Sequence, residues 1–498
     1  MATYDRIKQL LAERKYCEAV LLAGYTTRVD ATVDSLVKGV GKCKYFNMLD
    51  PAGRKAVLNI LGIAHLLLLH LEKAASFFIQ SGNYLALKRV MSIALRHGRF
   101  DVLFKLKNQP GCEIPEDEYK SFLREKALPL LLVTRNNSGF CVDEDVVNRI
   151  AGELGEDKSR LLEDTIRLME EKGSRNLPRK YALSQMSGNP KLVSECEVRL
   201  KSMDGGRRKI DTILEAYCRA KGMRLVKKLQ DGDRDDFFPL VSHIYLVDEK
   251  GSSLVLKENL RLFSDFSRLD GYTVEREVLE KVKHPHVVGY KGYFTVHGIE
   301  FLRLEYLDGE NLERYSSSKS LPQEEACKIV KAIAEVLDYL LVNGIIYMDV
   351  KDKNVLYGKE IKLFDFGRAQ FIQAGLSLDK AFIPSLLSTP EYVPPEMGEN
   401  FICYPRSDVF SLGLLWCRLL TLKNPFQNCD FAEGDEHRES SLIKFALPAM
   451  LLEPNLTDRV FVENPKLSRF IKAMLDKDHT KRPWPAEVAK FVERKEFL

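Results

Sequence analysis

The fold class of this chain is decided by the stretch Tyr347-Met-Asp-Val-Lys-Asp-Lys-Asn-Val-Leu356, which is followed closely by Leu363-Phe-Asp-Phe-Gly367. Both stretches set charged or polar residues among apolar ones. Any one triplet in them is common by chance, and a helix–turn–strand with chance acidic residues is the plain alternative. The complete ordered set at this spacing is not expected by chance, and it favours a shared chemical role.

In order and spacing, the two stretches resemble the catalytic loop and the metal-binding Asp-Phe-Gly motif of eukaryotic-type protein kinases. The resemblance implies transfer of the γ-phosphate of ATP to a hydroxyl group, which requires in-line positioning and neutralised phosphate charge. It implies that Asp349 orients the hydroxyl and accepts its proton, and that Lys351 neutralises the γ-phosphate. Asn354 and Asp365 would hold magnesium, which prefers hard oxygen ligands.

The same resemblance implies an ATP site in earlier segments. Lys257 ends a Leu-Val-Leu-Lys run and would reach the α- and β-phosphates, and Glu275 stands where a carboxylate pairs with this lysine. The run Leu304-Glu-Tyr-Leu307 is similar to the hinge, in which Glu305 and Leu307 would hold the adenine edge. The residues expected to sandwich the ring are Ile244, Val255 and Leu356.

Downstream residues extend the resemblance over about 221–498. The run Ser388–Glu396 is similar to the end of the activation segment, and Glu396 is expected to pair with Arg482. Asp408 matches the residue that braces the catalytic loop backbone. The Thr-x-x-Tyr spacing that begins at Thr389 is typical of the Ser/Thr branch of the family, so we expect Ser/Thr acceptors.

Two departures from the family pattern concern the nucleotide and the catalytic aspartate. Phe237, Pro239 and Ser242 stand where three glycines normally let backbone amides approach the phosphates. We expect weaker ATP binding, or a loop that becomes ordered only with substrate. Met348 stands where the family usually has an arginine, so it offers no cation beside Asp349.

Three classes of function remain open on the sequence alone. The first is an active protein serine/threonine kinase, and the second is a pseudokinase scaffold that binds partners without catalysis. The complete set of catalytic residues favours the first, and the missing glycines favour the second. The third is a small-molecule kinase of the aminoglycoside-phosphotransferase type, which Glu396 and Arg482 disfavour because such enzymes lack that peptide platform.

The first half of the chain is predicted to be helical, because apolar residues recur there at spacings of three and four. Leu61-Gly62, Ala74, Phe78 and Ser81 resemble part of the tetratricopeptide consensus, in which small residues let paired helices approach. Without a clean period, an irregular bundle and a repeat solenoid stay open. Residues 201–209 contain Gly205-Gly206 and are expected to form a linker or loop.

The predicted architecture is therefore multidomain: an all-α region at 1–215, solenoid-like or bundle, then an α+β bilobal kinase fold. Within that fold we expect the N-lobe at 221–306 and the C-lobe at 307–498, because short β-rich runs precede the helices. The helical region is expected to dock a protein partner. Structural support for the kinase is the rival role.

The composition argues against several classes of protein and of binding partner. The chain of 498 residues is 45% hydrophobic and 29% charged, as in ordinary globular proteins. A net charge of +4 without a dense Lys/Arg run argues against nucleic acid as a partner. Ten scattered cysteines indicate reduced thiols and a cytoplasmic protein. The most apolar stretch is shorter than the ~20 residues of a membrane helix, so no membrane span is expected.

Overall fold

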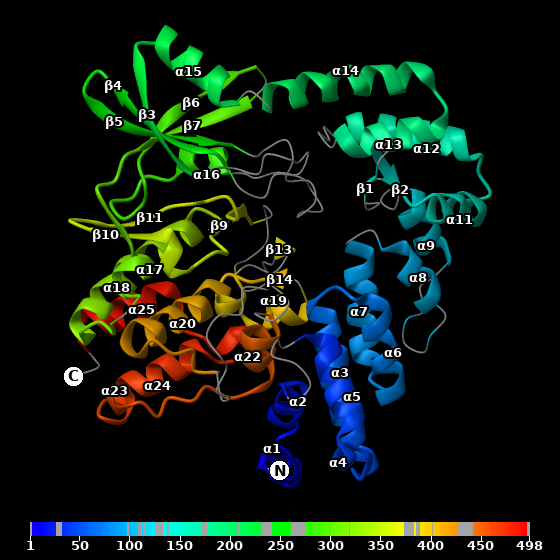
Figure 1. Cartoon of the computed structure of the whole chain (residues 1–498), viewed down its shortest axis with the longest axis vertical. Coiled ribbons are helices and arrows are strands. Elements are labelled where there is room, and N and C mark those ends of the chain that lie inside the picture. Colours follow the sequence, from blue (N-terminus) through cyan, green and yellow to red (C-terminus); the bar gives the residue numbers. More distant parts are fainter. Residues whose placement is uncertain are drawn as a thin grey trace. The chain divides into compact units, whose positions relative to one another are not determined.

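The structure is a computed structural model, shown in Figure 1. It describes residues 2–25, 32–96, 99–107, 109, 112, 116–124, 133–136, 139–171, 177–207, 210–230, 242–259, 275–297, 299–317, 319–372, 383–384, 389–400, 402–426 and 442–495. These residues belong to two compact units. Unit 1 comprises residues 1–90, 284–287 and 309–498, and unit 2 comprises residues 91–283 and 288–308.

Unit 1 begins with a set of helices that confirms the helical prediction for this region. They are α1 (Ala2–Ala12), α2 (Tyr16–Tyr25), α3 (Val33–Lys42), α4 (Lys44–Asn47), α5 (Pro51–Leu67), α6 (Leu71–Ser81) and the start of α7 (Tyr84–Arg96). Helix α5 begins where the Asp50 carboxylate accepts a hydrogen bond from the Gly53 N–H at 2.7 Å.

Helices α5 and α6 pack closely, as the tetratricopeptide-like residues predict for one helix pair. A Cβ atom at Gly62 would lie 2.5 Å from Cε1 of Phe78, so only glycine fits beneath this ring. Ala74 and Phe78 are buried. The Ser81 hydroxyl donates to Asn59 Oδ1 at 2.7 Å, which ties the end of α6 back to α5. The small residue at position 62 therefore sets the approach of the two helices.

The remainder of unit 1 is built around α20 (Ser407–Thr421), in which 13 of 15 residues are buried. A small antiparallel sheet has the strand order β11-β10-β8. The other elements are β8 (Gly309–Asn311), α17 (Leu312–Tyr315), α18 (Gln323–Val342), β9 (Ile345–Ile346), η3 (Asp352–Asn354), β10 (Val355–Gly358), β11 (Ile361–Leu363), β12 (Gln370–Phe371), β13 (Ile383–Pro384), η5 (Pro390–Tyr392), α19 (Pro395–Asn400), β14 (Ile402–Cys403), η6 (Leu442–Ala446), α22 (Leu447–Leu451), α23 (Arg459–Val462), α24 (Pro465–Met474), η7 (His479–Lys481) and α25 (Pro485–Glu493).

Unit 2 contains a five-stranded antiparallel sheet in the order β3-β4-β5-β7-β6. Its strands are β3 (Met223–Gln230), β4 (Ile244–Glu249), β5 (Ser252–Glu258), β6 (Tyr290–Val296) and β7 (Ile299–Glu305), with α16 (Glu275–Lys281) between β5 and β6. The short β-rich runs that the sequence predicted form β3, β4 and β5. The expected arrangement of a helical region followed by an α+β region is confirmed.

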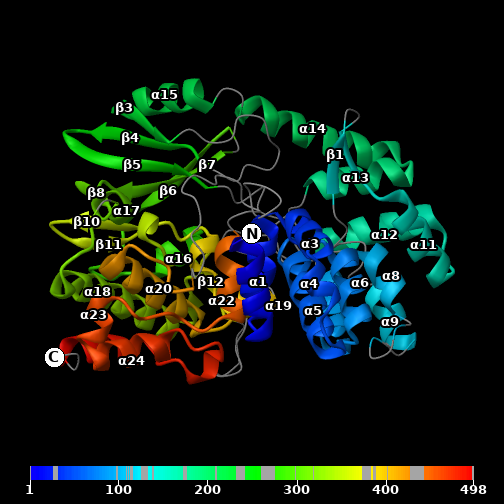
Figure 2. The same ribbon diagram turned by 60° about the horizontal axis from the view of Figure 1, so that its bottom comes forward.

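Helix α15 (Ile210–Ala220) covers one face of this sheet and lies along β3 in Figure 2. Its apolar residues Ile210, Leu214 and Cys218 pack with alternate sheet residues, among them Leu254 and Leu256 of β5. Because side chains alternate across a strand, Val255 and Lys257 lie on the opposite face. The residues between the two predicted domains, 216–220, belong to α15, and the division into residues 1–215, 221–306 and 307–498 stays a prediction.

The rest of unit 2 is helical except for one hairpin. Its elements are α8 (Phe100–Leu106), α9 (Glu116–Phe122), β1 (Val133–Asn136), β2 (Gly139–Val142), α11 (Glu144–Leu154), α12 (Lys158–Glu171), α13 (Leu177–Ser187) and α14 (Pro190–Arg207). The hairpin of β1 and β2 was not predicted from the sequence. The expected linker over residues 201–209 is wrong for residues 201–207, which continue α14, and residues 208–209 lie outside the described residues.

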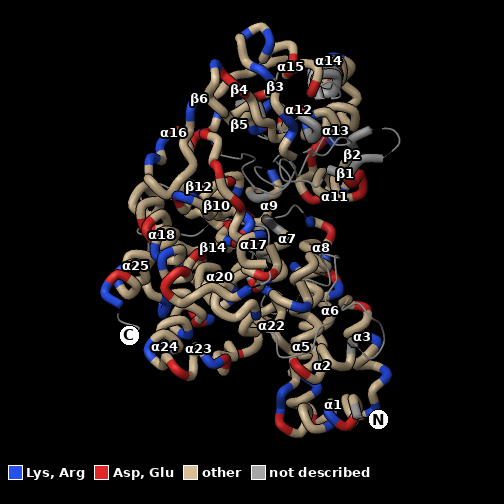
Figure 3. The backbone as a smooth tube through the Cα atoms, turned by 60° about the vertical axis from the view of Figure 1, so that its left-hand side comes forward, with Lys and Arg blue, Asp and Glu red and all other residues tan. Residues whose placement is uncertain are grey.

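The described helices include none long and apolar enough to cross a membrane. Figure 3 shows Lys and Arg interspersed with Asp and Glu along the tube. This mixture agrees with the small net charge of +4. The absence of a nucleic-acid partner stays a prediction.

Replacing Leu214 by alanine tests the role of α15. The Leu214 side chain is 0% exposed, and truncating such a residue typically costs about 2–5 kcal/mol. We expect a lower thermal midpoint and a lower free energy of unfolding, measured by circular dichroism. Leu85→Ala is the control, since Leu85 is 66% exposed and its loss should change stability by less than about 0.5 kcal/mol. Equal stability of the two variants would contradict the packing of α15.

Candidate active site

The loop between β9 and β10 brings the predicted catalytic residues together. The Asp349 carboxylate is buried, and its Oδ2 atom lies 2.8 Å from Nζ of Lys351. The Asn354 side-chain N–H donates to the same Oδ2 at 2.8 Å and to the Asp349 carbonyl at 2.9 Å. Asp349 is therefore held from two sides, by a cation and by an amide. Such fixed geometry suits a group that must orient a hydroxyl.

Lys351 also connects this loop to the platform segment, which we define as residues 389–400. Its ammonium group donates to Oγ1 of Thr389 at 3.0 Å. Thr389 thus lies beside the Lys351–Asp349 pair. Through Lys351, the start of the platform segment is therefore linked to the Asp349 carboxylate.

Asp408, at the first turn of α20, braces the beginning of the catalytic loop. Its two carboxylate oxygens accept hydrogen bonds from the N–H groups of Tyr347 and Met348, at 3.0 and 2.9 Å. Met348 has a φ of +64°, a conformation that costs a non-glycine residue about 1–3 kcal/mol. Burial raises the pKa of Asp408 to about 7, although both N–H donors act to lower it.

The Asp-Phe-Gly segment lies against the catalytic loop through backbone and ring contacts. The Phe364 N–H donates to the Asn354 carbonyl at 3.0 Å, and the Tyr347 hydroxyl donates to the Phe364 carbonyl at 2.6 Å. The rings of Tyr347 and Phe366 meet edge to face with centroids 5.2 Å apart. These contacts bring the segments that carry Asn354 and Asp365 together.

Asn354 and Asp365 have the donor chemistry that a magnesium ion requires. The Asn354 amide spends its N–H donors on Asp349, which leaves the amide oxygen as its acceptor group. Asp365 supplies carboxylate oxygens from a residue with a φ of +62°, and the Gly367 N–H approaches its Oδ1 at 3.4 Å. An amide oxygen and a carboxylate form a hard oxygen set, which fits magnesium bound together with phosphates.

In unit 2, Lys257 and Glu275 form the ion pair that the sequence predicted. Nζ of Lys257 donates to Oε1 of Glu275 at 2.7 Å, and the side chains are 9% and 4% exposed. Strand β5 supplies the lysine and α16 the carboxylate. Unpaired, each charge would be costly at this depth, and the pair with its hydrogen bond reduces that cost.

The other predicted nucleotide residues are divided between the units. Ile244 lies opposite Lys257 in the register of β4 and β5, and Val255 lies two residues before Lys257 in β5. Glu305 ends β7 and accepts a hydrogen bond from the Gly289 N–H at 2.7 Å, and Leu307 follows, partly buried. Leu356 belongs to β10 of unit 1. Their shared role around one adenine ring stays a prediction.

Only part of the unusual nucleotide loop belongs to the described residues. Phe237 and Pro239 lie outside them. Ser242 is described and buried, just before β4, and its carbonyl accepts a hydrogen bond from the Gln230 side chain at 3.1 Å. At the position where the family pattern has its last glycine, this chain therefore has the buried side chain of Ser242.

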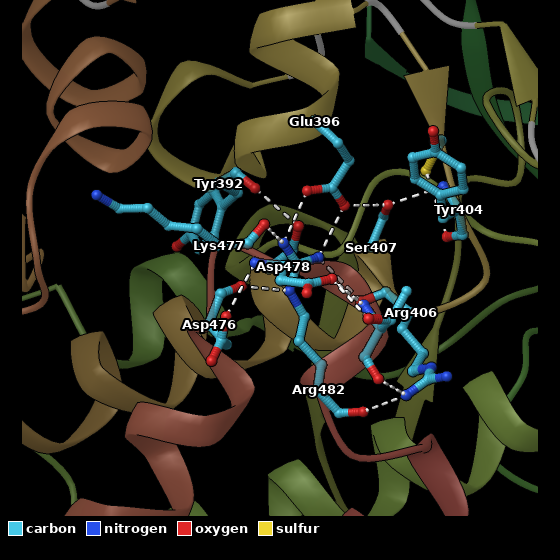
Figure 4. Close-up of polar contacts among 12 residues, drawn as sticks. Tyr392, Glu396, Tyr404, Arg406, Ser407, Asp476, Lys477, Asp478 and Arg482 are labelled. Atoms are coloured by element: carbon cyan, nitrogen blue, oxygen red, sulfur yellow. Dashed lines mark hydrogen bonds and ion pairs between the residues drawn. The ribbon is translucent and has the colours of Figure 1, made fainter.

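The predicted pair of Glu396 and Arg482 anchors the platform segment, as Figure 4 shows. Two guanidinium N–H groups of Arg482 donate to the two Glu396 carboxylate oxygens, both at 2.7 Å. Ser407 donates a further short hydrogen bond to Glu396. Burial acts to raise the pKa of Glu396, but the Arg482 guanidinium outweighs it and keeps this pKa below its usual value. The platform is therefore fixed by a buried, charged and bidentate contact.

Two contacts of this site were not found by sequence reasoning. Arg418 of α20 pairs with Asp352 of the catalytic loop, and the Ser411 hydroxyl of α20 donates to the Tyr392 carbonyl at 2.7 Å. The signal for the first was present, because Arg418 is the only charged residue between Val409 and Thr421 of this apolar helix.

Comparison with known proteins agrees with the geometry. Residues 245–491, almost half of the chain, match the protein kinase domain family. Among curated relatives, serine/threonine-protein kinase Nek3 of Mus musculus is 31% identical over 191 residues, which are 37% of this chain and 36% of that protein. Serine/threonine-protein kinase pkn2 of Myxococcus xanthus is 30% identical over 223 residues, which are 43% of this chain and 25% of that protein.

A third relative is the brassinosteroid LRR receptor kinase BRI1 of Oryza sativa subsp. japonica, 30% identical over 232 residues that make up 43% of this chain and 20% of that protein. The chain thus spans no more than 36% of the length of these relatives. The matches and the fold together show that the chain contains a eukaryotic-type serine/threonine-protein kinase domain. The family expectation drawn from residues 347–367 is confirmed.

Replacing Asp408 by alanine leaves two buried backbone N–H groups without their acceptor. Each such group costs about 1–3 kcal/mol, so we expect the free energy of unfolding to fall by roughly 2–6 kcal/mol in urea denaturation. Asp5→Ala, at an exposed position of α1, is the control and should leave the midpoint unchanged. If Asp408→Ala, like Asp5→Ala, unfolds at the same urea midpoint as the parent, Asp408 does not brace the loop.

Proposed function

We propose that this protein is an active kinase that transfers the γ-phosphate of ATP to Ser/Thr hydroxyls of a protein substrate. The observation that carries the proposal is the ordered set around Asp349, in which Lys351, Asn354 and Thr389 are linked by contacts of 2.8–3.0 Å. The Lys257–Glu275 pair in unit 2 supports it. Magnesium, bound through Asn354 and Asp365, would supply neutralisation of the phosphate charge.

Each residue has a role that follows from its contacts. Asp349 orients the acceptor hydroxyl and receives its proton, because its carboxylate is the fixed acceptor of the loop. Lys351 places positive charge between Asp349 and Thr389, where the γ-phosphate of an incoming ATP would meet the acceptor. Lys257, oriented by Glu275, binds the α- and β-phosphates.

A pseudokinase scaffold is the rival function, and the atypical nucleotide loop is the feature that favours it. Buried ion pairs are costly, and apolar replacements of similar volume are often neutral or stabilising. A fold that only binds partners therefore does not need Lys257 with Glu275, or Asp349 with Lys351, at 4–16% side-chain exposure. Their retention favours catalysis. The loop then weakens ATP binding without abolishing it.

Phosphate transfer to a generic protein substrate tests this proposal. We expect incorporation of radiolabelled phosphate from magnesium–ATP into Ser and Thr, and a loss of at least about 100-fold in Asp349→Asn, since positioning and proton transfer are lost together. Asp349→Asn should still bind ATP, whereas Asp365→Ala should lose the magnesium-dependent part of binding. Phosphate incorporation that is equal in the parent and in Asp349→Asn would contradict the assignment. Mainly phosphotyrosine would contradict the acceptor class.

For the helical region we propose a protein-interaction role, with docking of a partner or substrate on residues 1–215. Support for docking comes from three large apolar side chains that are exposed near the turn between α6 and α7, namely Ile79, Tyr84 and Leu85, at 41%, 46% and 66%. Clustered exposed apolar residues are typical of interaction sites.

A second role, support of the kinase domain, is favoured by contacts within unit 1. Helix α5 packs against α19 and α22. A Cβ atom at Gly398 of α19 would lie 2.6 Å from the sulfur of Met450 and 3.2 Å from a methyl group of Leu67. Beside this contact, the Arg89 guanidinium lies 3.3 Å from the Glu399 carboxylate. The first helices therefore touch the platform segment two to three residues beyond Glu396.

Leu67→Ala separates the two roles. If α5 supports the platform segment, this variant should lower phosphorylation of a generic peptide and lower the thermal midpoint, because Leu67 is 1% exposed. Leu85→Asp is the matched surface change, and it should reduce partner capture while leaving peptide phosphorylation unaltered. Full peptide activity in a destabilised Leu67→Ala would contradict the supporting role.

A further inference from the structure

Asp352 is a buried carboxylate inside the catalytic loop, and the proposed mechanism does not use it. It begins η3, one residue after Lys351 and two before Asn354, and its side chain is 3% exposed. Oδ1 accepts a hydrogen bond from the Lys353 N–H at 2.9 Å. An ionised carboxylate at this depth is stable only with a compensating cation.

Arg418 supplies that cation from the buried helix α20. Its Nε atom lies 3.0 Å from Oδ2 of Asp352, and its side chain is 37% exposed. Arg418 lies ten residues after Asp408 on the same helix, about 15 Å along the axis at 1.5 Å per residue. Asp408 holds the N–H groups of residues 347 and 348, and Arg418 holds residue 352. The catalytic Asp349 lies between these two attachments.

The platform segment also contacts α20 and the residues just beyond its end. The Ser411 hydroxyl donates to the Tyr392 carbonyl at 2.7 Å, and the Asn424 side chain donates to the Glu391 carbonyl at 3.2 Å. Burial and the Asp352 carboxylate both raise the pKa of Tyr392 well above its usual value, so its phenol stays neutral beside the ion pair. The catalytic loop and the platform segment thus both contact α20, through Asp352 with Arg418 and through Tyr392 with Ser411.

We propose that Arg418 is a positioning residue for phosphate transfer: its ion pair with Asp352 fixes the second end of the catalytic loop and thereby holds Asp349 and Asn354 in their reactive geometry. This inference rests on the proposed kinase activity. Arg418 does not touch the reacting atoms. It acts through a loop residue whose charge it compensates.

If Asp352 and Arg418 form a buried ion pair, removing either partner or both should change kcat by different amounts. Arg418→Met leaves the Asp352 charge buried without its cation, so the loop must move to hydrate that charge. We expect kcat to fall by at least about tenfold, with little change in KM for ATP. Asp352→Asn removes the charge but keeps the shape of the side chain, so its kcat should fall by less than about threefold. The double variant, Asp352→Asn with Arg418→Met, should have a kcat within about threefold of that of Asp352→Asn, because no uncompensated charge remains.

With a generic protein substrate, the experiment measures kcat and the KM for ATP in the parent and the three variants, at a temperature where circular dichroism shows every variant folded. Arg459→Met is the matched control, since that side chain is 87% exposed and pairs only locally with Glu463 among the described residues. It should retain the parental kcat.

Recovery of kcat in the double variant supports the positioning role, because a merely structural arginine would change stability but not the kcat of folded protein. Parental kcat in Arg418→Met would overturn the inference, as would a double variant no better than Arg418→Met. An inactive parent would instead overturn the proposed function, and the positioning role with it.

Discussion

The burial of polar groups in helix α20 is the constraint on which the rest of the site depends. The polar side chains of Ser407, Asp408 and Ser411 are buried in unit 1, and buried polar groups need a hydrogen-bond partner. The partners are the carboxylate of Glu396, the first N–H groups of the catalytic loop and the carbonyl of Tyr392. One apolar helix with a few polar side chains thereby determines where both the catalytic loop and the platform segment lie.

This arrangement explains how separate segments act as one site. The catalytic loop is tied to α20 through Asp408 and to the platform segment through Lys351 and Thr389 at 3.0 Å. The platform segment is tied to the chain beyond α24 through Glu396 and Arg482. A hydroxyl acceptor and a phosphate donor must be aligned within fractions of an ångström, and these buried, charged hydrogen bonds are the strong and directional ones.

The sequence alone predicted those parts of the site whose residues lie close together in the chain. The spacing of Asp349, Lys351 and Asn354 identified the catalytic loop because these residues act within one turn of chain. Short β-rich runs bounded by turn residues predicted β4 and β5. The sequence was insufficient where tertiary packing decides: Gly205-Gly206 indicated a linker, yet α14 continues through it. The left-handed conformation of Met348 and the partner of Arg418 depend on α20, which is distant in sequence from the loop.

A crystal structure of the full chain soaked with magnesium and a non-hydrolysable ATP analogue tests the central claim most directly. The account predicts one nucleotide, with Lys257 at its α- and β-phosphates, with magnesium bound by Asn354 and Asp365, and with the γ-phosphate near Lys351. The Asp349 carboxylate should keep its contact with the Asn354 amide. A structure with no bound nucleotide at saturating concentration, or with nucleotide bound away from Lys257 and Asp365, would contradict the account.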